Sequence, residues 1–211
     1  MKLFKTTQKV FKTVPAGSHL ARLYKIIDVG TQMNDYKGQI TYPRKAIFFF
    51  EIHGEDSQGE PITTDDGKPL SVMREYTASL DERGKLSQML KQWLGSDVPN
   101  GFSPKELLGK FGMANISNTT KNDRTYANLD GVSPVPSIYA KTGLPAGFND
   151  LLFFSMESFD SVVYESFPNW IKEKIQRSPE FRRIAGGDKV QTAKSDVPAD
   201  FDDRFNDDVP F

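Results

Sequence analysis

The stretch LSVMREYTASLDERGKLSQMLKQWLG, residues 70–95, changes from one hydrophobic pattern to another. Its first part, residues 70–80, contains Val, Tyr and Thr and is predicted to form a strand. In the second part the apolar residues recur at helical spacing, and they are Leu86, Met89, Leu90, Trp93 and Leu94. Asp81 is expected to cap this helix and Gly95 to end it. The stretch therefore predicts a strand followed directly by a helix.

Further strands are predicted on both sides of this stretch. Residues 19–29 and 45–56 precede it, separated by a long polar loop, and residues 110–120 and 125–135 follow it around a short turn. A short helix over 103–109 leads into the last two strands. Three strands, a helix and two strands is the chain order of an OB-fold, a small Greek-key barrel. We therefore expect a mainly β protein with a five-stranded OB-fold barrel and a helix between strands three and four.

The chain divides into four predicted parts. Residues 1–15 are predicted to be a basic N-terminal arm, and residues 16–135 are assigned to the OB-fold domain that contains the strands. Residues 136–185 are predicted to be a helical extension that packs either on the barrel or on another subunit of a homo-oligomer. Residues 186–211 have few apolar side chains to bury and are expected to be a disordered acidic tail.

Charge is distributed unevenly along the chain. The formal net charge is −1, but the last 16 residues carry six Asp and one Arg. The remaining residues hold 26 Lys and Arg against 22 Asp and Glu, a net of +4. A basic body with an acidic tail suggests a polyanionic partner for the body, although chance fluctuation of charge gives the same pattern in some chains.

Several classes of function have little support in the sequence. The chain has no cysteine, and its two histidines, His19 and His53, lie far apart, so we expect no disulfide, metal or cofactor. No segment approaches the roughly 20 apolar residues of a membrane span, and the first residues lack the apolar core of a secretory signal, so a cytoplasmic location is expected. Carboxylates are abundant but lie in turns and in the tail, so a metal-dependent nuclease is a weak alternative to a protein without enzymatic activity.

Basic residues interleaved with aromatic residues are the main functional signal. Single-stranded nucleic acid binds such surfaces because bases stack on aromatic rings and cations follow the phosphates. The predicted binding residues are Arg22, Tyr24, Lys25, Tyr36, Lys37, Tyr42, Arg44, Lys45, Phe49, Arg74, Tyr76, Lys121, Arg124 and Tyr126. Several of these have a structural alternative, because Tyr76 shares a face with Val72 and Leu80 and could belong to the core. For the second strand we expect Ala46, Phe48, Phe50 and Ile52 to face the core and Phe49 to face outward.

The last residues, NDDVPF, resemble the acidic tip of bacterial single-stranded DNA-binding proteins. The matching residues are Asp207, Asp208, Val209, Pro210 and Phe211. In that family the tip docks into partner proteins of replication, recombination and repair. The aromatic ring can fill an apolar pocket while the carboxylates meet Lys or Arg at its rim.

The body is similar to the single-stranded DNA-binding proteins of tailed phages, across most of residues 15–184. The similar segments include LARLYKIIDVGTQMNDYKG, YTASL, LLGKFGMANI and TYANLDGVSPV. This resemblance implies sequence-nonspecific binding and protection of single-stranded DNA in phage replication or recombination, in the host cytoplasm and without catalysis. The alternative is a replication or recombination accessory protein, a mediator that acts mainly through protein contacts.

Overall fold

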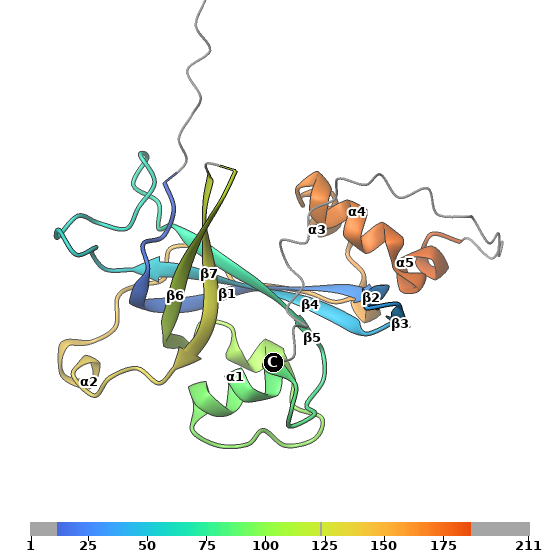
Figure 1. Ribbon diagram of the computed structural model, residues 1–211, viewed down its shortest axis with the longest axis horizontal. Coiled ribbons are helices and arrows are strands. Elements are labelled where there is room, and N and C mark those ends of the chain that lie inside the picture. Colours follow the sequence, from blue (N-terminus) through green and yellow to red (C-terminus); the bar gives the residue numbers. More distant parts are fainter. Residues whose placement is uncertain (1–11, 123, 187–211) are drawn as a thin grey trace, which may run out of the picture.

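The computed structural model in Figure 1 describes residues 12–122 and 124–186. The expected basic arm falls largely outside the described residues, since residues 1–11 are not among them. The same holds for residues 187–211 of the expected tail, which include the acidic tip from Asp207 to Phe211.

Most strands join one main sheet. They are β1 (Gly17–Thr31), β4 (Arg44–His53), β5 (Ser71–Thr77), β6 (Phe111–Lys121), β7 (Arg124–Ser133) and the short β8 (Leu152–Phe154). A separate small hairpin consists of β2 (Asn34–Tyr36) and β3 (Gln39–Thr41). The helical elements are α1 (Lys85–Leu94), η1 (Pro104–Leu107), α2 (Tyr139–Thr142), η2 (Met156–Ser158), α3 (Ser161–Glu165), α4 (Asn169–Arg177) and α5 (Pro179–Ile184).

The sheet is organised around the long strand β1. The strand order is β5-β4-β1-β6-β7, and every neighbouring pair in it is antiparallel. Residues 17–22 of β1 pair with β6, whereas residues 25–27 pair with β8, which runs parallel to β1. The chain is therefore mainly β, with α1 and η1 between the third and fourth of the predicted strands, as expected.

The five-stranded barrel itself is not confirmed, because the sheet has six strands and is not closed. Among the described residues no strand pairing joins the two edge strands β5 and β7. The guanidinium of Arg74 on β5 crosses between them and donates to the carbonyl oxygens of Leu129 and Asp130. A side chain therefore links the two edges where a closed barrel would have a backbone ladder.

The inner face of the sheet carries the larger core. Ala46, Phe48, Phe50 and Ile52 all face inward, which confirms the predicted alternation along β4. Helix α1 covers one end of this core with its apolar stripe, and Trp93 donates its ring N–H to the carbonyl of Phe111 at 2.9 Å. Gly112 allows this approach, because a Cβ there would come within 2.5 Å of the indole nitrogen.

The ends of α1 differ from each other in how well the sequence predicted them. Gly95 ends the helix in the left-handed conformation, with φ of 73°, as predicted. The predicted cap at Asp81 is wrong, because the helix begins at Lys85 with Gly84 in the capping position. Asp81 instead accepts a hydrogen bond from the backbone N–H of Arg83 at 2.9 Å and so forms the turn before the helix.

A second core lies on the outer face of the sheet. Apolar side chains of β1, β4, β8 and the C-terminal helices meet there, namely Ile27, Val29, Ile47, Phe154, Met156, Tyr164, Phe167, Ile171 and Ile175. Figure 1 shows α3, α4 and α5 grouped at one end of the sheet, across the strands from α1. The C-terminal part of the chain thus covers a portion of the outer face.

Gly30 fixes where this C-terminal part meets β1. Its φ is 73°, and a Cβ at this position would lie 2.6 Å from the Cβ of Ser178. The next residue, Thr31, donates to the Glu180 carboxylate through its backbone N–H at 3.0 Å and its hydroxyl at 2.7 Å. A glycine is therefore required here both for the backbone conformation and for the close contact.

Several elements were not predicted from the sequence, among them α2 and η2. The polar loop after β1 contains the β2–β3 hairpin, and the segment after β7 contributes the strand β8. A third C-terminal helix, α5, follows the two expected ones. The proposed domain boundaries at residues 16–135 and 136–185 stay predictions.

Candidate nucleic-acid interface

The strand register arranges the outer face of β1, β4 and β5 into three rows of outward side chains. The residues of each row are directly paired neighbours on the three strands. Row one is Arg22, Glu51 and Ser71; the middle row is Lys25, Phe49 and Met73; row three is Ile27, Ile47 and Glu75.

A β-bulge on β1 enriches the middle row. The register shifts between Leu23 and Lys25, so Tyr24 and Lys25 both project near Phe49. The Lys25 ammonium lies 5.3 Å from the centre of the Tyr24 ring and 5.2 Å from that of Phe49. The two rings meet edge to face with their centres 6.4 Å apart. The bulge thus builds a cation between two aromatic rings, and each contact is within cation–π range.

The environment of the middle row changes the acidity of its groups. Burial lowers the pKa of the Lys25 ammonium, because a partly desolvated cation is less favourable than a neutral amine. Burial also raises the pKa of Tyr24, whose hydroxyl reaches the Ser71 hydroxyl at 3.5 Å. A phosphate placed against Lys25 would stabilise the charged ammonium and so offset the cost of its burial.

Row one is covered by the segment that follows α2. Glu51 is fully buried and pairs with Arg22 at 2.8 Å and with His53 at 3.1 Å. Its carboxylate also accepts hydrogen bonds from the backbone N–H groups of Phe148, at 3.0 Å, and Asn149, at 2.8 Å. Burial opposes ionisation of Glu51, but these hydrogen bonds outweigh it and lower its pKa. The carboxylate therefore fastens residues 148 and 149 to the sheet.

Row three is covered by the C-terminal helices. Ile27 and Ile47 are buried in the second core. Glu75, at the β5 end of the row, is ion-paired with Lys174 of α4. Between Glu51 and Ile47, the middle-row residues Lys25, Phe49 and Met73 are only partly buried, and Phe49 and Met73 still pack against the second core.

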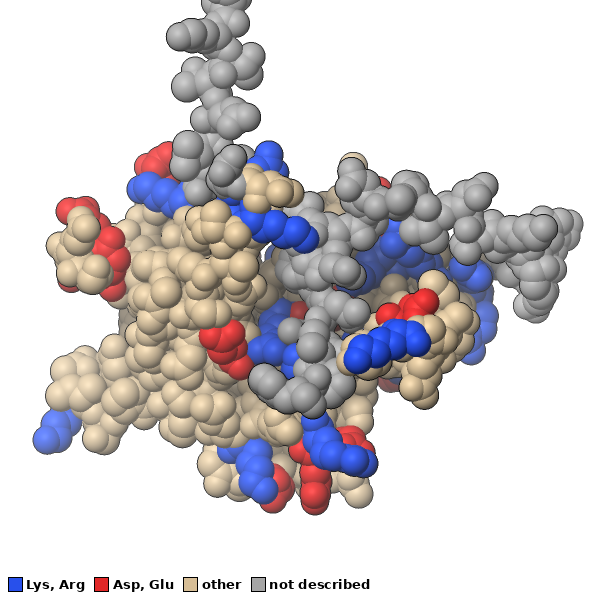
Figure 2. Space-filling view, viewed as in Figure 1, with Lys and Arg blue, Asp and Glu red and all other residues tan. Residues whose placement is uncertain are grey.

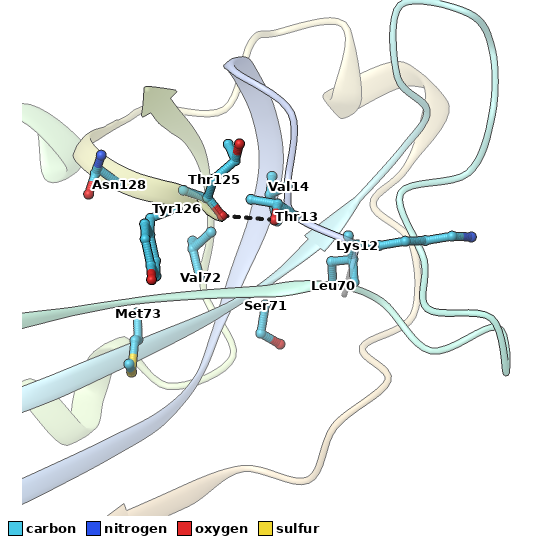
Figure 3. Close-up of a pocket in the computed structure, with 11 residues that line it drawn as sticks. Lys12, Thr13, Val14, Leu70, Ser71, Val72, Met73, Thr125, Tyr126 and Asn128 are labelled. Carbon is cyan, nitrogen blue, oxygen red and sulfur yellow. Dashed lines mark hydrogen bonds between the residues drawn. The ribbon is translucent and has the colours of Figure 1, made fainter. Parts of the chain in front are cut away.

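A groove continues the middle row toward β7. Its volume is about 270 Å³, and it is lined by Ser71 and Met73 of β5, by residues 125–128 of β7 and by the segment 12–14. Figure 3 shows Tyr126 beside Val72 on one side of β5, and Met73 and Ser71 on its other side. The Thr13 hydroxyl donates to the carbonyl of Thr125 at 3.2 Å, which holds the N-terminal segment along the groove.

Strands β6 and β7 form a long hairpin that projects from the rest of the sheet (Figure 1). Lys121 and Arg124 flank the tip, and both side chains are exposed. The partly buried or exposed aromatic, thioether and cationic groups of these elements are Lys25, Phe49, Met73, Tyr126, Lys121 and Arg124. We call these residues, with Tyr24, the candidate interface.

Comparison with known proteins assigns no family to this chain. No protein-family model matches the sequence, and no curated protein matches it. Within the described residues no group of three or more His, Asp or Glu side chains could hold a metal ion, and no helix is long and apolar enough to cross a membrane.

The structure brings six of the predicted binding residues into the candidate interface. They are Tyr24, Lys25, Phe49, Lys121, Arg124 and Tyr126. Tyr24 is largely buried behind Lys25, so Phe49 and Tyr126 offer the more accessible rings of this group.

Four predicted residues lie elsewhere for reasons of pairing or strand parity. Arg22 is buried against Glu51, and Lys45 is buried at the start of β4. Arg74 and Tyr76 share the inward parity of Val72, and Tyr76 is only 2% exposed in the inner core. On β5 it is therefore the alternate set, Ser71 and Met73, that reaches the outer face.

The other four predicted residues lie between the end of β1 and the first residue of β4. Tyr36 and Lys37 lie on the β2–β3 hairpin, where the Lys37 ammonium is 5.2 Å from the Tyr36 ring centre. Tyr42 is 65% exposed just after this hairpin. Arg44 is ion-paired with Asp28 at 2.5 Å and with Glu157 at 3.1 Å, and the bond to Asp28 raises the guanidinium pKa. No described contact joins these four residues to the candidate interface.

Sequence reasoning missed Met73 and the Glu51 cluster. Met73 could have been found from the alternation of β5. Val72 and Tyr76 face the inner core, so Met73, at the alternate position, faces outward. The Glu51 cluster had no such signal, since its partners Phe148 and Asn149 are nearly 100 residues away in the chain.

Proposed function

We propose that this protein binds single-stranded DNA without strong sequence preference and protects it during phage replication or recombination. The observation that carries the proposal is the partly buried middle row, in which Lys25 sits between aromatic rings, with Met73 and Tyr126 lining the adjacent groove. Unpaired bases can stack on such rings for about 1–3 kcal/mol each, whereas bases in a duplex are already stacked on one another.

The proposed fold is the OB-fold. The antiparallel order β5-β4-β1-β6-β7, the position of α1 between β5 and β6, and the Arg74 link from β5 to β7 support it. In OB-folds nucleic acid binds over the second and third strands and the neighbouring loops, which correspond here to β4, β5 and the β6–β7 tip. Phe49, Met73, Lys121 and Arg124 of the candidate interface belong to those elements, and Tyr24 and Lys25 belong to the neighbouring strand β1.

We further propose that the protein has no enzymatic activity and that it acts in the host cytoplasm, where the acidic tip recruits partner proteins. The tip, Asp207 to Phe211, is proposed from its sequence alone. A shortened chain ending at Ser195 tests this part, because it should lose the replication or recombination partners and bind DNA at least as tightly. Incubation of labelled single strands with Mg²⁺ or Mn²⁺ tests the absence of nuclease activity, and shortened DNA would contradict it.

The main experiment is equilibrium binding of labelled oligo-dT, a mixed-sequence single strand and a matching duplex. We expect tight binding of both single strands, weak binding of the duplex, and affinity that falls with salt at a log–log slope of about −0.7 per phosphate neutralised. Binding that does not depend on salt, or that favours the duplex, would refute the proposal.

A second candidate is an accessory protein that acts through protein contacts. It is favoured by exposed apolar side chains on the segment after β7, namely Ile138, Leu144, Phe148 and Leu151. Capture of a recombination protein by the chain ending at Ser195, together with no binding of oligo-dT, would favour this candidate over DNA binding.

A further inference from the structure

Helix α4 lies beside row three of the outer face and presents one flank to β5. Its buried side is formed by Ile171 and Ile175, which pack in the second core. Lys174 lies next to this side and is ion-paired with Glu75, the outward residue of β5 two positions after Met73. The ion pair therefore fixes which flank of α4 faces the edge of the candidate interface.

Helical spacing places two more side chains on that flank. Residues three or four positions apart lie above one another on a helix, so Trp170, Lys174 and Arg177 form one line. The opposite flank carries Lys172, which pairs with Glu165 at 3.1 Å and so faces the end of α3. Trp170 and Arg177 thus share the β5 side of α4, one helical turn to each side of Lys174.

Trp170 is unusual for an apolar residue of α4. Its indole is 37% exposed, although the other apolar residues of this helix, Ile171 and Ile175, are buried. Tryptophan is rarely buried completely, and a partly exposed indole among cations offers a ring face on which a base can stack. Figure 2 shows Lys and Arg side chains gathered over the region of α4 and α5.

We propose that the β5-facing flank of α4 is a second wall of the single-stranded DNA site, with Trp170 stacking on a base and Arg177 meeting a phosphate. This inference rests on the proposed function and extends its site beyond the middle row. Lys174 acts as a positioning residue, because its pair with Glu75 neutralises the acid that would otherwise repel the strand. The cations of this flank, which the Lys174–Glu75 pair holds against β5, favour DNA over a protein partner.

Tryptophan fluorescence tests the stacking directly, because the chain has two tryptophans with different surroundings. Trp93 is 4% exposed and donates its ring N–H to Phe111, so DNA should leave its emission unchanged. We expect oligo-dT to quench the emission of the full-length protein. The quenching should vanish in the Trp170→Leu variant and persist in a Trp93→Phe variant.

Affinities of matched variants measure the contribution of the flank. Trp170→Leu should weaken oligo-dT binding by about five- to 100-fold, the range for loss of one stacked base, and Trp170→Phe should restore part of it. Arg177→Gln should weaken binding and reduce the salt slope by about 0.7, whereas Lys172→Gln on the opposite flank should leave the slope unchanged. Thermal unfolding of each variant shows whether the fold is kept.

Two failures are distinguishable. If the unaltered protein does not bind oligo-dT at low salt, the proposed function fails and this inference fails with it. If the protein binds but its emission is not quenched, and Trp170→Leu binds as tightly as the unaltered chain, then the α4 wall alone is refuted.

Discussion

The middle row of the outer face differs from the rows on either side of it in what covers it. Row one is closed by residues 148 and 149, which hydrogen-bond to Glu51, and row three is closed by the C-terminal helices over Ile47. Phe49, between them on the same strand, is half-exposed and has Lys25 against its ring. One strand thus presents a buried charge, an accessible aromatic ring and a buried apolar side chain at alternate positions.

This difference shows that the C-terminal part of the chain both stabilises the sheet and limits the surface open to a ligand. Because the flanking rows are covered, a strip of partly buried side chains remains across β1, β4 and β5, namely Lys25, Phe49 and Met73. A strip that crosses the strands suits a single strand of DNA, since successive bases can meet successive β-strands. The predictions below test first the covered rows and then the open one.

The largest effect should come from removing the carboxylate of row one. Glu51→Ala leaves the buried Arg22 guanidinium without its partner and frees the backbone N–H groups of residues 148 and 149. Loss of one member of a buried pair typically costs about 3–5 kcal/mol. Urea unfolding should show a decrease of this size, and a loss below about 1 kcal/mol would mean that row one does not anchor the segment.

An exposed ion pair provides the control for this variant. Asp97 pairs with Lys91 at 2.9 Å, and both side chains are largely exposed. Asp97→Ala should therefore change the free energy of unfolding by less than about 1 kcal/mol. Similar losses in the two variants would contradict the distinction between the covered row and the surface.

Acid should weaken row one by a smaller amount. The pKa of Glu51 is lowered from its usual 4.5, so its contribution to stability is complete above that pH and is lost as pH falls through the lower folded-state value. Protonation keeps part of the hydrogen bonding that Glu51→Ala removes, which makes the effect smaller. The difference in unfolding free energy between the unaltered chain and Glu51→Gln should shrink on acidification, and a constant difference would exclude Glu51 as the source.

The open row and the covered rows were not equally predictable from the sequence. Alternation along β4 gave the inward set of Ala46, Phe48, Phe50 and Ile52 and so placed Phe49 outside, because a strand has a strict period of two. The same reasoning applied to β5 would have favoured Met73 over Arg74 and Tyr76. Local pattern therefore sufficed for the long strands of the sheet and for six of the fourteen predicted residues, which lie in the candidate interface.

The coverage of the outer face was not predictable, because it depends on contacts between distant parts of the chain. The β-bulge at Tyr24 and Lys25 has no mark in the sequence, and β8 is too short to show a period. In the sequence, Glu51, Asp28 and Glu75 cannot be distinguished from exposed carboxylates of a strand, because the residues that bind them come from distant parts of the chain. Their partners, such as Asn149, Met156 and Lys174, are about 100 or more residues away.

Removing the ring at the centre of the open row should weaken DNA binding with little loss of stability. Phe49→Leu keeps an apolar side chain but removes the surface on which a base would stack, which is worth about 1–3 kcal/mol of binding free energy. Titration of labelled oligo-dT should show this loss. Phe102→Leu, which changes a ring packed against the inner core, is the matched control and should bind as tightly as the unaltered chain.

The smallest effect should come from the exposed tip of the β6–β7 hairpin. Arg124→Gln removes one cation at the end of the open row, and it should reduce the log–log salt slope by about 0.7 while lowering affinity equally for different base sequences. Lys110→Gln removes an exposed cation at the opposite end of β6 and should leave the slope unchanged. If the two variants reduce the slope equally, then the DNA responds to the net charge of the protein. The open row would in that case not define its path.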